Sequence, residues 1–149
     1  MHRDTTRWDM LTRQRQHNRI LQLSFINDDG PEAELLINRL EASEALSRDF
    51  CYTLELLSND ADIALKSVMG KLLCAALTRG DGTQRYFTGY VDRFSFIRSD
   101  GGIAFYEARL VPWLAFLKSG KNNRVFHRLS LEGLSAELFS GCRLHAQWD

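Results

Sequence analysis

The residues that could act as a nucleophile stand apart from one another in the sequence. Gly133-Leu134-Ser135-Ala136-Glu137 has the first half of a nucleophile elbow but lacks its second glycine. Ser135 also falls within a helical pattern rather than at a strand-to-helix turn. Cys51 and His127 would form a thiol–imidazole pair only if the fold joined them. A catalytic cysteine needs a cation or a helix N-terminus beside it, and Cys51 stands between two aromatic residues of an apparent strand. A buried structural thiol is therefore the favoured interpretation.

The motifs for metal and phosphate binding are incomplete. Cys142 and His145 have the spacing of half a zinc site, without a second pair of ligands. Asn59-Asp60-Ala61-Asp62 lacks the glycine and the terminal glutamate of a calcium loop. Gly70-Lys71 and Gly120-Lys121 lack the upstream glycine and the following serine or threonine of a P-loop. We therefore expect no catalytic, cofactor-binding or metal-binding residue and no cofactor, and we expect that the chain is not an enzyme.

The composition is that of an ordinary globular domain. Of 149 residues, 44% are hydrophobic and 26% are charged, and 19 Lys and Arg balance 19 Asp and Glu. Nucleic-acid binding usually requires a basic excess, so no nucleic-acid partner is expected. No apolar run approaches the ~20 residues of a membrane-spanning helix. Three cysteines at wide spacings do not form a disulfide framework, which predicts folding in a reducing compartment.

The chain divides into three parts. Residues 1–18 hold Arg3, Arg7, Arg13 and Arg15 but no apolar segment, so we interpret them as a polar N-terminal tail and not as a secretory signal. Residues 19–120 carry patterns that are typical of β-strands. Residues 121–149 are the start of a further segment.

Alternation of apolar and polar residues predicts β-strands over residues 21–25, 50–56 and 106–110. Residues 72–77 are apolar throughout, which predicts a strand buried on both faces. Residues 84–98 form a long aromatic run, whose apolar phase moves from Phe87 and Val91 to Phe94 and Phe96. A change of phase within one strand indicates a bulge or a bend, and Gly89 would tolerate the bend or a close backbone approach.

Turn signals separate these runs. Turn clusters that contain glycine lie at residues 27–31, 79–82 and 99–102, and glycine supplies the positive φ values of tight turns. We expect the strands to follow one another as a meander. Long, twisted strands favour curling, so the predicted fold is mainly β, an antiparallel β-barrel with a few short helices.

The helical signals are short. Residues 62–69 form a brief helical pattern that ends at Gly70, and Pro112 ends a strand before a turn or two over residues 113–117. Ser130 is a plausible N-cap for a helix with apolar residues at helical spacing, which Gly141 ends.

Aromatic residues concentrate between Tyr86 and Phe116. One interpretation is barrel core and cross-strand pairs. The other is a surface where another subunit docks, because tyrosine and tryptophan are favoured at interfaces.

An ordered series of segments resembles a known family. It comprises Glu41-Ala42-Ser43-Glu44-Ala45-Leu46-Ser47-Arg48-Asp49-Phe50, residues 52–58, Gly70-Lys71, residues 85–91, Phe94, residues 106–114, residues 124–126 and Leu129-Ser130. Its order and spacing are similar to the N-terminal region of VgrG, the valine-glycine repeat spike protein of type VI secretion, and to related phage baseplate-hub proteins. The resemblance covers roughly residues 20–139.

The resemblance implies a structural role. Members of this family are trimeric spikes, in which two related β-barrels form a ring that docks on the hexameric Hcp tube. An OB-fold domain and a β-helical needle come after this ring, and the hub itself is not catalytic. The implied partners are other VgrG-like subunits, an Hcp-type tube protein, baseplate proteins and effectors. The implied localisation is cytoplasmic before assembly, with export by the type VI apparatus without a signal peptide. This chain has room for the first barrel and the start of the next segment, as a fragment or a truncated product.

Two other functions remain open from the sequence. A β-barrel ligand-binding module would have an open, partly apolar pocket, whereas the hub interpretation predicts an interior filled by Phe50, Tyr52, Leu54, Phe87 and Tyr106. The other alternative is a small cysteine-dependent hydrolase that uses Cys51.

Overall fold

The computed structural model describes residues 20–118 and 125–140. The chain divides into two compact units, Met1–Pro112 and Trp113–Asp149, and each is described by itself. The elements of the first unit are β1 (Leu21–Phe25), β2 (Leu36–Ser43), β3 (Cys51–Ser58), the 3-10 helix η2 (Leu65–Ser67), β4 (Leu72–Thr78), β5 (Gln84–Asp100) and β6 (Ile103–Val111). The segment boundaries predicted after residues 18 and 120 lie outside the described residues, and they stay predictions.

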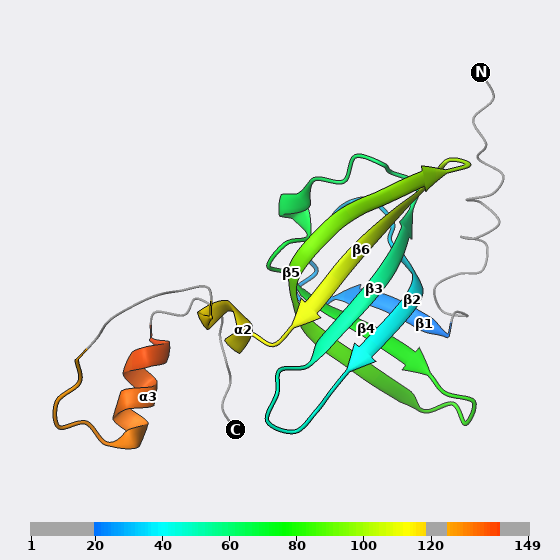
Figure 1. Cartoon of the computed structure of the whole chain (residues 1–149). Coiled ribbons are helices and arrows are strands. Elements are labelled where there is room, and N and C mark those ends of the chain that lie inside the picture. Colours follow the sequence, from blue (N-terminus) through cyan, green and yellow to red (C-terminus); the bar gives the residue numbers. More distant parts are fainter. Residues whose placement is uncertain (1–19, 119–124, 141–149) are drawn as a thin grey trace. The chain divides into compact units, whose positions relative to one another are not determined.

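The six strands form one antiparallel sheet in the order β1-β4-β5-β6-β3-β2. The sheet curls into a half-barrel, and the edge strands β1 and β2 come close to each other (Figure 1). No backbone ladder joins β1 to β2 in the described sheet. The mainly β, antiparallel, barrel-like fold is confirmed.

The predicted meander is wrong in two places. β4 and β5, and β5 and β6, are neighbours as expected, and β2, for which no strand bounds were predicted, pairs with β3. However, β1 pairs with β4 and β3 pairs with β6. Tight turns at 79–83 and 101–102 bring their flanking strands together as hairpins. The connections over residues 26–35 and 59–71 are long enough to cross the end of the sheet. Their length costs little stability, because the entropy lost on closing a loop grows only slowly with its length.

The long strand β5 contains the predicted irregularity. Its register against β6 shifts between Val91 and Arg93, and again between Phe96 and Arg98. The first shift moves the buried positions from Val91, with no exposed surface, to Phe94, with 4%. An extra residue in one strand bends it and increases its twist, and β5 bends strongly around the sheet (Figure 1).

The concave interior is filled by side chains. Tyr52, Leu54, Phe87 and Tyr106 belong to one buried cluster, against which Phe50 packs. The Tyr52 ring stacks on Phe50 at 4.6 Å and meets Phe87 edge-on at 5.3 Å. These are the residues that the hub interpretation placed inside.

The described residues of the second unit form two short helices, α2 (Leu114–Leu117) and α3 (Leu131–Phe139). The predicted N-cap is confirmed, because the Ser130 hydroxyl accepts a hydrogen bond from the backbone N–H of Gly133 at 3.1 Å. The Trp113 ring meets Phe139 edge-on at 5.2 Å. Neither helix contains a buried residue among those described.

Candidate functional site

The structure places one possible nucleophile on a helix and the other on a strand. The Ser135 hydroxyl donates to the backbone carbonyl of Leu131 at 2.8 Å, one turn earlier in α3, so it is not at an elbow. Cys51 is partly buried in β3 and belongs to the first unit, whereas His127 belongs to the second. Cys142, His145 and Gly120-Lys121 lie outside the described residues.

The segment that resembled a calcium loop is a turn stabilised by its own hydrogen bonds. The carboxylate of Asp60 accepts from the backbone N–H of Asp62 at 2.8 Å. The buried Tyr106 hydroxyl donates to the Asp60 carbonyl at 2.9 Å and accepts from the N–H of Ile63 at 3.3 Å. Over the described ranges, no group of three or more His, Cys, Asp or Glu side chains could hold a metal ion.

Gly70-Lys71 joins the short 3-10 helix to β4. Gly70 has φ +74°, a conformation that suits glycine, and its N–H donates to the Val91 carbonyl at 2.8 Å. The Lys71 ammonium forms an ion pair with Asp29 at 3.0 Å. These bonds connect two strands and a loop, which is a structural role.

A three-residue cluster, which we call the Glu44 clamp, connects the β2–β3 loop to two strands. The Tyr52 hydroxyl donates to one oxygen of the Glu44 carboxylate at 2.7 Å, and the Arg85 guanidinium donates to the other at 2.8 Å. The bond from Tyr52 is the main cause that lowers the pKa of Glu44. Burial, followed by the bond to Glu44, raises the pKa of Tyr52 to about 12.

The Glu44 clamp predicts a pH dependence of stability. The pKa of Glu44 is lower in the folded chain than its ordinary value of 4.5. Its contribution is therefore present above that value and is lost as the pH falls through the folded pKa. We expect Glu44→Gln to flatten the loss of stability between about pH 5 and about pH 3. Urea unfolding at a series of pH values measures this.

Glu32→Gln is the matched control, because Glu32 is an exposed carboxylate of the β1–β2 loop. Its profile should fall with acid as steeply as that of the unchanged chain. Parallel profiles for the unchanged chain and Glu44→Gln would contradict the role given to the clamp.

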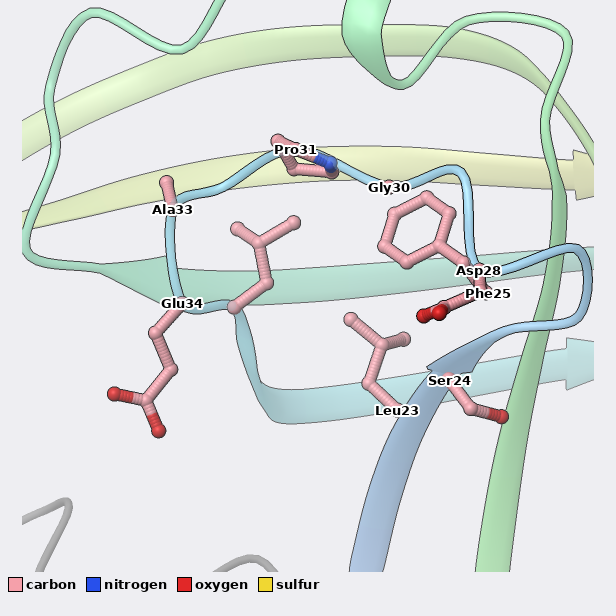
Figure 2. Close-up of a pocket in the computed structure, with 9 residues that line it drawn as sticks. Leu23, Ser24, Phe25, Asp28, Gly30, Pro31, Ala33 and Glu34 are labelled. Carbon is pink, nitrogen blue, oxygen red and sulfur yellow. The ribbon is translucent and has the colours of Figure 1, made fainter.

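A cavity of about 370 Å³ lies where the β1–β2 loop leaves β1 and returns toward β2. We call it the β1–β2 socket, and Figure 2 shows its lining. It is lined by Leu23, Ser24, Phe25, Asp28, Gly30, Pro31, Ala33, Glu34 and Leu35. Gly30 is required there, because a Cβ atom would lie 2.5 Å from the Phe25 ring. Sequence reasoning did not find this cavity, since its residues had signalled only a turn.

Comparison with models of protein families finds one family that matches the chain. The family model of the phage tail baseplate hub (GPD) matches residues 43–148, which is more than half of the chain. The chain belongs to the phage tail baseplate hub family. The resemblance seen in the sequence is thereby confirmed.

Individual relatives of this hub chain are type VI secretion proteins. It is 34% identical to the spike protein VgrG1b of Pseudomonas aeruginosa over 120 residues, which cover 79% of this chain and 16% of VgrG1b. It is also 34% identical to VgrG1c of the same organism, covering 83% of this chain and 17% of VgrG1c. The hub chain thus spans about a sixth of the length of these relatives.

A solved structure shares the fold of the hub chain. It is the E. coli c3393 protein, described as a component of the type VI secretion system with structural similarity to the T4 bacteriophage tail proteins gp27 and gp5. The TM-score is 0.67 at 23% identity, and the match covers 83% of this chain and 33% of that one.

The aromatic run of the hub chain contributes to both interior and surface. Phe87, Phe94 and Tyr106 are buried, whereas Tyr86 is 61% exposed and Phe96 is 48% exposed. The buried residues of this run therefore fit the interpretation as core, and the exposed ones fit the interpretation as a docking surface. Within the described ranges, no helix has the length and apolar character that a membrane crossing requires.

Proposed function

We propose that this chain is the N-terminal hub part of a VgrG-like spike, and that it acts as a structural docking module without catalytic residues. The observation that carries the proposal is the baseplate-hub match over residues 43–148. The 34% identity to VgrG1b over most of the chain supports it.

The geometry supports a building block. The interior is filled by a single buried cluster, so the curled sheet keeps its shape without a ligand. Within the described sheet, the edge strands β1 and β2 have a hydrogen-bonded neighbour strand on one side only. Edge strands are templates for pairing with another chain. Function would then come from buried area and symmetry.

The proposed partners follow from the family. They are further VgrG-like subunits in a trimer, an Hcp-type tube protein, and baseplate proteins and effectors. The proposed localisation is the cytoplasm before assembly, followed by export through the type VI apparatus without a signal peptide. The filled interior counts against a ligand site among its buried residues, whereas the partly apolar β1–β2 socket is the one observation that favours the ligand-binding alternative. The hydrolase alternative has only the partly buried Cys51 thiol in its favour.

Docking is tested by pull-down and light scattering with an Hcp-type tube protein from the same organism. The chain, and a spike-length protein that carries it, are tagged and mixed with the hexameric ring. We expect the spike-length protein to elute with the ring, because its trimer would present three copies of the docking surface. A tagged protein of similar size but unrelated fold is the control.

Two results would contradict the proposal. If neither protein associates with the ring, the docking role is wrong. If the chain hydrolyses an ester or a peptide and Cys51→Ser abolishes the turnover, the structural role is wrong.

A further inference from the structure

The β1–β2 socket combines apolar side chains with one carboxylate. Its lining includes the side chains of Leu23, Phe25 and Leu35 and the carboxylate of Asp28, whereas the Glu34 side chain points away from those of Leu23 and Phe25 (Figure 2). In Figure 2 the Asp28 carboxylate lies between the side chains of Leu23 and Phe25. A ligand that enters this cavity therefore meets hydrocarbon and negative charge together.

The negative charge of Asp28 is not balanced by a cation of the described residues. Asp28 takes part in none of the ion pairs that these residues form. The lysine that reaches this loop, Lys71, is bound to Asp29. The Asp28 carboxylate repels an anion and favours a cation by simple charge complementarity.

The cavity is large enough for one long side chain. About 370 Å³ is at the small end of the ~300–1,000 Å³ typical of ligand pockets. Arginine combines an apolar stem with a planar cation, which binds carboxylates through two parallel hydrogen bonds and stacks on aromatic rings. The carboxylate of Asp28 and the ring of Phe25 could provide these two contacts.

The position of the cavity points to a polypeptide. Its lining comes from the end of edge strand β1 and from the loop that leads into edge strand β2. A segment that runs along either edge can add main-chain hydrogen bonds while its side chain fills a pocket. We propose that the β1–β2 socket receives an arginine side chain from a segment of a neighbouring protein chain. This inference does not depend on the spike role.

The test is an NMR titration of the full 149-residue chain, labelled with nitrogen-15. The probe is the peptide acetyl-Ala-Gly-Arg-Gly-Ala-amide, and the matched probe carries neutral citrulline in place of arginine. We expect amide shifts centred on Ser24, Phe25 and Asp28, and about tenfold weaker binding of the citrulline peptide, because hydrogen bonds to charged groups are the stronger ones.

Asp28→Asn should raise the dissociation constant of the arginine peptide about fivefold. Asparagine keeps the backbone, because Asp28 has φ +52° and asparagine tolerates this region. Glu32→Gln is the control variant, since Glu32 is on the same loop but outside the lining, and it should leave the affinity unchanged.

Four results would overturn the proposal. They are equal binding of the citrulline peptide, shifts centred elsewhere, and equal affinity for free arginine, which would indicate a small-molecule site. The fourth is a change of the socket amides in an Arg13→Gln, Arg15→Gln variant without peptide, which would indicate that the chain's own N-terminal segment fills the cavity.

Discussion

Replacing Leu56 by alanine is expected to lower the free energy of unfolding by about 3 kcal/mol. Leu56 lies in β3, between β2 and β6 in the sheet, and its side chain has no exposed surface. It faces Tyr106 across the ladder to β6. The substitution removes buried methyl groups and leaves a cavity that the packed interior fills only in part. Urea unfolding followed by circular dichroism measures the change.

The chain offers a matched control for this substitution. Leu46 is 97% exposed in the β2–β3 loop, and Leu46→Ala should change the unfolding free energy by less than about 0.5 kcal/mol. The same atoms are removed in both variants, so the difference measures burial. A cost of Leu56→Ala below about 1 kcal/mol would mean that the interior is not packed as described.

Gly89→Ala is expected to destabilise the chain by about 1 to 2 kcal/mol. A Cβ atom at this position would lie 3.1 Å from the Leu110 Cβ, from the Phe50 ring and from the Val111 carbonyl oxygen. Two of these neighbours are fixed by the backbone of β6. Alanine ordinarily stabilises a strand relative to glycine, so a loss of stability would show that the close approach dominates. The measurement is thermal or urea unfolding.

Gly80→Ala is the control for this prediction. Gly80 lies at the β4–β5 turn, and a Cβ atom there would meet nothing within 4 Å. We expect its unfolding free energy to change by less than about 0.5 kcal/mol. If the two variants are equally stable, the close packing of β5 against β6 at Gly89 is wrong.

Local patterns predicted the strands because alternation is a property of the chain itself. In β3, Tyr52, Leu54 and Leu56 point inward and are buried, with at most 6% of their surface exposed. The bulge in β5 was predictable for the same reason, since the change of apolar phase accompanies the extra residue. The cap at Ser130 likewise depends on residues within one helical turn.

Order across the sheet was not predictable from such patterns. β1 and β4 pair with Leu23 opposite Ala75, although neither segment carries a sequence pattern that identifies the other as its partner. The bounds of strand β2 could not be predicted from apolar alternation, because only its first two residues, Leu36 and Ile37, are buried. The Glu44 clamp joins residues 41 positions apart, a separation at which a single sequence carries no pairing signal.

The amino-acid sequence by itself determined which residues face the interior, where the turns lie and to which family the order of segments belongs. Each of these depends on near neighbours along the chain or on a recognisable order of segments. Only the tertiary structure decided which strands pair, how Glu44 bonds to Arg85, and that Asp28 lies over an apolar cavity. These features depend on which of several distant segments bury one another's side chains and pair their backbones. The stability of the folded chain as a whole decides this.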